Sequence, residues 1–88
     1  MATVVIPALL RKLTAGRERV TASGRNLGEV IADLDRQYPG FRDQLIADGD
    51  IKASVAVSID GEVGINGVLD PVGPSSEVHF MPAISGGV

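Results

Sequence analysis

The chain has 88 residues, of which 44% are hydrophobic and 22% are charged, and its net charge is −3. This composition predicts one globular domain with a modest core, and the mild acidity argues against a nucleic-acid-binding protein, which needs a basic face. The absence of cysteine excludes a thiol nucleophile, a disulfide scaffold and a thiolate metal site, and a single histidine, His79, excludes a histidine cluster.

No apolar run in the sequence is long enough for a membrane span. The first residues also lack the basic and apolar regions that make up a signal peptide. We therefore expect a cytoplasmic protein whose partners include neither a membrane nor a nucleic acid.

The first quarter of the chain is predicted to form two strands. The segment Thr3–Leu10, TVVIPALL, is rich in β-branched and aliphatic residues. Pro7 lacks an amide hydrogen, so we expect it near the end of this strand or at an unpaired edge. A turn over residues 14–18, with Gly16 at positive φ, leads to a returning strand over residues 19–22.

A helix is the clearest predicted element. Asn26 can cap it, and Glu29 three residues later completes the pattern of a capping box. Pro39 and Gly40 end it, and a shorter helical or irregular piece follows around Phe41. One apolar stripe with helical spacing faces the core: Leu27, Val30, Ile31, Leu34 and Tyr38.

The second half of the chain is predicted to add strands to the same sheet. Residues 47–50 form a loop, and alternation over residues 55–59 indicates a half-buried strand. Asp60-Gly61 is a strong hairpin signal, with a return over 62–65, and a last strand contains Val78–Met81. One helix cannot cover both faces of this sheet, so we expect an α+β fold with a mixed sheet and the helix packed on one face.

No group of residues in the sequence forms a catalytic constellation. His79 has only Glu77 near it on the same strand face, so we interpret it as a solvent-side polar residue. The glycines at 61, 64 and 67 match neither a dinucleotide-binding motif nor a P-loop. Two pairs of acids are interpreted as solvated surface because neither pair has the spacing of a metal site: Asp33 with Asp35, and Asp48 with Asp50.

Met81 is a candidate contact residue. If Val78 and Phe80 face the helix, His79 and Met81 face the uncovered side of the sheet. An exposed methionine often marks a partner site, although a single exposed apolar residue is also normal. The sequence around Met81 leaves both interpretations open.

The chain closes with Ala83-Ile84-Ser85-Gly86-Gly87-Val88, directly after Pro82. Pro82 ends regular pairing, and two adjacent glycines predict a slim, flexible finger. Such a finger is either a frayed end or a segment that an enzyme encloses to reach a terminal carboxyl group. A carboxylate becomes reactive toward sulfur or nitrogen nucleophiles once ATP converts it to an acyl-adenylate.

Three segments carry a resemblance to the MoaD/ThiS family of ubiquitin-like sulfur carriers. They are the opening VVIPALLRKLTAG, the helix NLGEVIADLDRQYPG and the ending SEVHFMPAISGG. The resemblance implies a β-grasp domain over residues 1–82 and a tail over residues 83–88. The pieces IPALLR, ASG and LGEVIADL are further similar to the branch of the family that serves cysteine synthesis.

The family resemblance also implies the chemistry of the tail. Gly87 would be adenylated by a MoeB/ThiF-like enzyme that uses ATP, and then converted to a thiocarboxylate that donates sulfur to a synthase. The protein itself would be a carrier rather than an enzyme, with no bound cofactor and no metal. The residues implied to contact its partners are Met81, Pro82, Ala83, Ile84, Ser85 and Gly86.

Val88 departs from the family pattern because it locks the Gly87 carboxyl group in a peptide bond. We expect a precursor from which a zinc-dependent JAMM-type protease cleaves the Gly87–Val88 bond; alternatively, Val88 is incidental or this copy is never activated. Three other functions stay open: the small subunit of molybdopterin synthase, a protein modifier joined to lysines, and an interaction module with an inert tail.

Overall fold

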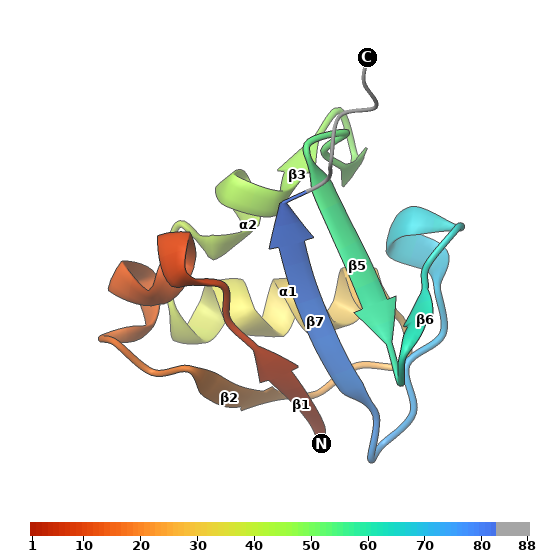
Figure 1. Cartoon of the computed structure of the whole chain (residues 1–88), viewed down its shortest axis with the longest axis horizontal. Coiled ribbons are helices and arrows are strands. Elements are labelled where there is room, and N and C mark those ends of the chain that lie inside the picture. Colours follow the sequence, from red (N-terminus) through yellow and green to blue (C-terminus); the bar gives the residue numbers. More distant parts are fainter. Residues whose placement is uncertain (83–88) are drawn as a thin grey trace.

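The computed structural model describes residues 1–82, and Figure 1 shows a twisted sheet with one long helix behind it. The elements, in chain order, are β1 (Ala2–Val5), the 3-10 helix η1 (Ala8–Thr14), β2 (Arg19–Ala22), α1 (Leu27–Gln37), α2 (Phe41–Leu45), β3 (Ile46–Ala47), β4 (Asp50–Ile51), β5 (Val55–Ile59), β6 (Glu62–Val63), the 3-10 helix η2 (Gly67–Leu69) and β7 (Glu77–Pro82). Among these residues no helix is long and apolar enough to cross a membrane.

Five strands form the main sheet in the order β2-β1-β7-β5-β6. β1 and β7 run parallel, and every other neighbouring pair is antiparallel. β3 and β4 form a separate two-stranded sheet. The predicted mixed sheet with its main helix on one face is therefore confirmed.

The predicted first strand is wrong beyond Val5. After Pro7, whose φ of −66° and ψ of 153° are extended, the chain turns into η1, and the amide of Leu10 donates to the Pro7 carbonyl. The physical reason lies in composition: β-branched residues stop at Ile6, and the following ALLRKL consists of good helix formers. Arg19–Ala22 returns as β2, as predicted.

The predicted helix cap at Asn26 is confirmed. The Asn26 side chain accepts from the amide of Glu29 at 2.9 Å. The Glu29 carboxylate reaches back to the amide of Arg25 at 2.8 Å, one residue earlier than in an ordinary capping box. Both ends of this interaction tie the loop before α1 to its first turn.

Two hairpins close with paired positive φ values. Asp60 and Gly61 have φ of 53° and 86°, which is the turn that Asp-Gly predicts between β5 and β6. Asp48 and Gly49, predicted only as part of a loop, form the same kind of turn between β3 and β4, with φ of 54° and 81°. The return strand β6 spans only two of the four residues predicted for it.

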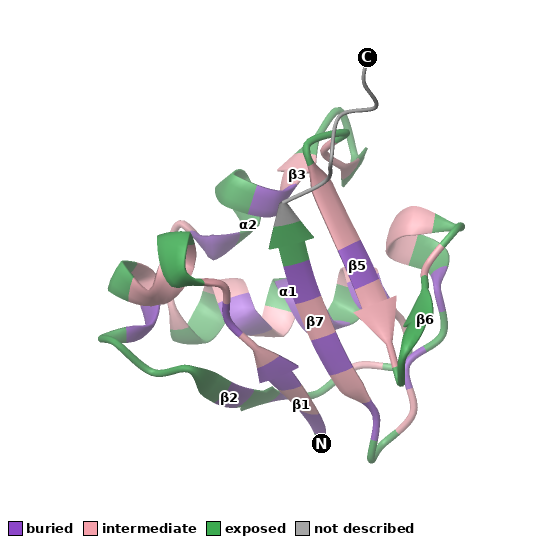
Figure 2. Ribbon diagram, in the orientation of Figure 1, coloured by how far each residue is buried: buried purple, intermediate pink, exposed green. Residues whose placement is uncertain are grey.

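The core lies between α1 and the covered face of the sheet. Figure 2 shows buried residues alternating with half-buried or exposed ones along β1 and β7. Phe80 of β7 meets Phe41 of α2 edge to face, with ring centroids 6.3 Å apart. The buried side chains from α1 are Leu27, Val30, Ile31 and Leu34.

The outer edge of β2 is closed by side chains of α1. The Gln37 amide group donates to the carbonyl of Thr21 at 3.0 Å, and the amide of Ser23 donates to the Asp33 carboxylate at 2.9 Å. The Asp33 side chain is only 13% exposed. The expectation that Asp33 is solvated surface is therefore wrong, because it satisfies backbone groups at a sheet edge.

Asp35 is also a structural residue rather than free surface. Its carboxylate accepts from the amides of Gly40 at 3.2 Å and Arg42 at 3.1 Å. These bonds fasten the α1–α2 turn, where Gly40 has φ of 97°. The two acids point in different directions, as predicted, and each stabilises a different loop.

We expect protonation of Asp33 to account for part of the stability that the protein loses at low pH. Its pKa lies below the usual value, first because the Ser23 amide donates to the carboxylate, with Gln37 and Arg36 adding to the effect. A lowered folded-state pKa gives stability that is present above about pH 4 and lost as the pH falls further. Urea unfolding of Asp33→Asn between pH 6 and about pH 2.5 should therefore show a flatter loss of stability than wild type.

Asp60 and Glu77 also have a lowered pKa, so Asp33→Asn should reduce the acid loss without abolishing it. The matched control is Asp43→Asn, which removes an exposed carboxylate from α2. If Asp33→Asn and wild type lost stability in parallel as the pH fell, the role given to Asp33 would be wrong.

Candidate docking face and the root of the C-terminal segment

The C-terminal segment leaves the fold from its central strand. β7 lies between β1 and β5, and its last residue, Pro82, is in register with Val55 of β5. Residues 83–88 follow directly, so the predicted site residues Ala83, Ile84, Ser85, Gly86, Gly87 and Val88 lie outside the described residues. The structure therefore bears on this site through its root, where β5 pairs with Met81 and Pro82, whereas β1 pairs with Glu77, Val78 and His79 further back along β7.

Alternation along β7 splits its side chains between two faces. Val78 and Phe80 are buried against α1, at 0% and 3% exposure. Glu77, His79 and Met81 point to the opposite face, which α1 leaves uncovered in Figure 1. The prediction that His79 and Met81 share the open face is confirmed.

Met81 lies next to the root of the C-terminal segment, with 37% of its surface exposed. Its register partner across the sheet is Ala56 of β5, a small side chain that leaves the methionine accessible. One step further from the root, Val5 of β1 lies opposite His79. Because side chains in register share a face, these residues form the open-face patch: Val5, Ala56, His79 and Met81.

Sequence reasoning found Met81 and His79 but missed Val5 and Ala56. Both missed residues lie on strands that were predicted or partly predicted, so the alternation of polar and apolar side chains was visible. What the sequence did not contain was the register of β1 and β5 against β7. That register depends on which strands become neighbours, a long-range choice.

A charged network occupies the other end of the open face. His79 Nε2 lies 2.7 Å from Glu77 Oε1, and Arg19 Nη1 donates to Glu77 Oε2 at 3.0 Å. The hydrogen bond from His79, followed by that from Arg19, lowers the pKa of the Glu77 carboxyl group. Glu77 thus stays ionised near neutral pH and orients both of its neighbours.

This network has the parts of a surface contact rather than of an active site. Three cavities in the described part of the chain are lined by residues outside this network. Within residues 1–82, no three histidine, aspartate or glutamate side chains gather in a way that could hold a metal ion. The open face therefore offers an apolar contact near the root and an Arg–Glu–His contact beyond it.

The sequence profile of the ThiS family matches residues 4–87 of this chain. The sulfur carrier protein CysO of Mycobacterium tuberculosis is 36% identical over 90 residues, which cover 97% of each chain. Its crystal structure aligns with a TM-score of 0.90 at 31% identity over 96% of this chain and 100% of that chain.

Two further similarities widen the comparison. A chain of the Amycolatopsis orientalis BexX/CysO complex aligns with a TM-score of 0.91 at 27% identity, covering 99% of this chain and all of that chain. Small archaeal modifier protein 3 of Haloferax volcanii is 30% identical over 63 residues, 69% of this chain and 68% of that protein. With these neighbours, the mixed sheet and its helix make up the predicted ubiquitin-like β-grasp fold.

Substitutions on the two faces of β7 should differ in how much they lower the free energy of unfolding. Phe80→Ala removes a ring buried against Phe41 and should lower the free energy of unfolding by about 3–5 kcal/mol. Met81→Ser, one residue away on the open face, should change it by less than about 0.5 kcal/mol. Urea unfolding of both variants measures the contrast, and equal losses would show that the open face is covered in the folded protein.

Proposed function

Since the chain belongs to the ThiS family, we propose that it is a sulfur carrier whose C-terminal glycine, Gly87, bears the transferred sulfur as a thiocarboxylate. The observation that carries this proposal is the family match, which extends to Gly87 and stops before Val88. The protein acts as a co-substrate of other enzymes. Cysteine synthesis is the pathway that we assign to it, on the strength of the similarity to CysO.

The geometry at the root fits a carrier. A reactive end must be presented to an enzyme while the body stays folded, and β7 is anchored on both sides by neighbouring strands and beneath by α1. Six residues separate Pro82 from the end of the chain. Fully extended, they reach at most about 20 Å, which suffices for entry into a narrow channel.

The proposed chemistry has two steps. The freed Gly87 carboxylate attacks the α-phosphorus of ATP, forming an acyl-adenylate and releasing pyrophosphate. Sulfide (HS−) supplied by a donor then attacks the acyl carbon, AMP leaves with the electrons of the C–O bond, and loss of the sulfur-bound proton gives the Gly87 thiocarboxylate. Gly86 and Gly87 have no side chains, so an enzyme can enclose the backbone on all sides.

The open-face patch is the surface that we assign to the activating enzyme of the MoeB/ThiF type. Met81 and Ala56 lie beside the root, so an enzyme that draws in the C-terminal segment must approach this part of the sheet. Methionine adapts its shape to an opposing apolar surface. The Arg19–Glu77–His79 network can then fix orientation at the rim.

Val88 makes the protein a precursor in this proposal. A JAMM-type zinc protease hydrolyses the Gly87–Val88 bond, which frees the Gly87 carboxylate and releases valine. After activation and sulfur transfer to the carrier, a synthase binds the thiocarboxylate and accepts the sulfur. The BexX/CysO complex of the Amycolatopsis relative supports direct binding between a carrier of this shape and a partner protein.

Protein modification is a second candidate function, favoured by the similarity to small archaeal modifier protein 3. The same activated Gly87 would then be attacked by a lysine amine instead of sulfur, giving an isopeptide bond. Conjugates larger than the free chain in native extract would support this candidate, whereas a carrier gives a single free species.

The function is tested by intact-mass spectrometry after incubation with a MoeB-type enzyme, ATP and a sulfur donor. The chain ending at Gly87 should gain the mass of one oxygen-to-sulfur exchange. The chain with Val88 should stay unchanged unless a JAMM-type protease is added, because its Gly87 carboxyl group is in a peptide bond. A chain lacking Gly87 that still gained sulfur would contradict the proposal.

The contact assigned to Met81 is tested by steady-state kinetics of adenylation. Met81→Ser should raise the KM of the activating enzyme for the carrier about tenfold, since the loss of one central apolar contact costs about 1–2 kcal/mol. Leu69→Ser is the matched control, because Leu69 is 73% exposed and lies on η2, which packs against α1 on the covered side of the sheet. Equal KM values for the two variants would remove Met81 from the interface.

A further inference from the structure

The two edges of the main sheet differ in how far their backbone groups have hydrogen-bond partners. At the β2 edge, Gln37 and Asp33 of α1 occupy the backbone groups of Thr21 and Ser23. At the opposite edge, β6 pairs only with Ser58 and Ile59 of β5. Val55 and Ala56 therefore have β7 on one side and no paired strand on the other. On that outer side the Val55 amide already donates to the Lys52 carbonyl at 3.0 Å, and the Val57 carbonyl accepts from the Gly64 amide at 2.9 Å. By backbone alternation, the Val55 carbonyl and the Val57 amide are the groups with which a further strand could pair.

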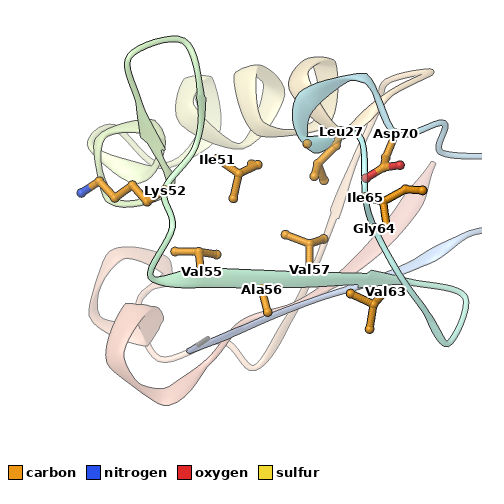
Figure 3. A pocket seen from close by; sticks show the side chains of 11 residues that line it. Leu27, Ile51, Lys52, Val55, Ala56, Val57, Val63, Gly64, Ile65 and Asp70 are labelled. Carbon is orange, nitrogen blue, oxygen red and sulfur yellow. The ribbon is translucent and has the colours of Figure 1, made fainter. Parts of the chain in front are cut away.

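A cavity of about 290 Å³, lined by apolar side chains together with Lys52 and Asp70, lies along this part of β5. Figure 3 shows Val55 and Val57 pointing into it from the strand, with Ile51 and Leu27 opposite them. Ala56 points the other way, toward the open face. The cavity thus has an apolar floor and a strand edge along one side, which are the two features of a groove that accepts an extended peptide.

Exposed apolar side chains recur in the segment that follows β5, and two of them, Val63 and Ile65, line this cavity. Val63, Ile65 and Leu69 are 69%, 88% and 73% exposed, and they lie within seven residues of each other. They make up half of the large exposed hydrophobic residues found in the described part of the chain. Single exposed apolar residues are ordinary, but three in one short segment indicate a contact surface.

The charge at this edge is negative. A second groove, of about 450 Å³, adjoins β6 and is lined by the exposed residues Asp60 and Glu62, by the buried Asp70 and by no basic residue. Asp70 and Asp60 already accept backbone amides, from Asn66 and Glu77 respectively, which holds both carboxylates in place. An occupant of this groove therefore needs positive charge beside apolar surface.

We propose that the β5–β6–η2 edge is a second docking surface, which binds an extended segment of a partner protein with alternating apolar and basic residues. The segment pairs with the Val55 carbonyl and the Val57 amide of β5, its apolar side chains fill the cavity, and its lysines or arginines meet the carboxylate of Glu62. This surface lies at a sheet edge, so it is separate from the open-face patch and from the chemistry of Gly87.

The carboxylates exclude a second copy of this chain as the favoured occupant. In a symmetric pairing of two such edges, Glu62 and Asp60 of both copies would approach one another. Like charges across an interface are unfavourable. Lys52, which lines the cavity, is the one basic residue near this edge between positions 43 and 77.

The test is a titration of the isotope-labelled full chain with two synthetic heptapeptides, followed by NMR amide shifts. One peptide alternates lysine with valine, and the other alternates glutamate with valine. The lysine peptide should shift the amides of Val55, Val57 and Gly64, and its affinity should fall about tenfold as salt rises from low to several hundred millimolar. The glutamate peptide should leave these amides in place.

Matched variants distinguish binding at the proposed docking surface from non-specific binding of the peptide. The double variant Glu62→Lys with Ile65→Ser should weaken binding of the lysine peptide about tenfold, and Leu9→Ser should leave it unchanged. Shifts confined to Val5, His79 and Met81, equal binding of both peptides, or no binding at millimolar peptide would overturn the proposal. Sedimentation showing a dimer through this edge would overturn it in favour of a second copy.

Discussion

The packing of β7 against α1 is the constraint on which the rest of the structure depends. β7 is the central strand of the sheet, and its Val78 and Phe80 are almost fully buried under the helix. Because β-strand side chains alternate, burying these two residues forces Glu77, His79 and Met81 to the other face. One hydrophobic contact thus fixes both the core and the orientation of the proposed docking face. It also fixes the point at which the C-terminal segment begins.

Three aspartates stabilise the loops around this core by accepting hydrogen bonds from backbone amides. Asp33 fastens the loop before α1, Asp35 fastens the turn after it, and Asp60 fastens the approach to β7 through the amide of Glu77 and the hydroxyl of Ser76. A carboxylate that accepts backbone amides is stabilised in its charged form. The acidic composition of the chain is therefore partly structural, and exposed acids such as Glu62 add negative charge to the surface.

The two edges of the main sheet differ in how far their backbone groups are paired, and this difference sets the character of the surface at each edge. Side chains of α1 cover the β2 edge, whereas β6 is too short to cover β5. An open edge is a hazard for aggregation unless it is charged or occupied. The carboxylates near β6 protect this edge from self-association and at the same time select a basic partner. The fold thereby separates an apolar face near the root of the C-terminal segment from an acidic edge beside it.

The sequence by itself determined the helix with its Asn26 cap, the Asp60-Gly61 turn, and the strand containing Val78 and Phe80, because local periodicity and backbone preference decide each of these. It misassigned the piece after Pro7, where strand and helix preferences compete over a few residues. Only the tertiary structure decided that β7 lies between β1 and β5, and hence that Val5 and Ala56 join Met81. The reason is that strand order and register arise from contacts between residues far apart in the chain, which no local pattern encodes.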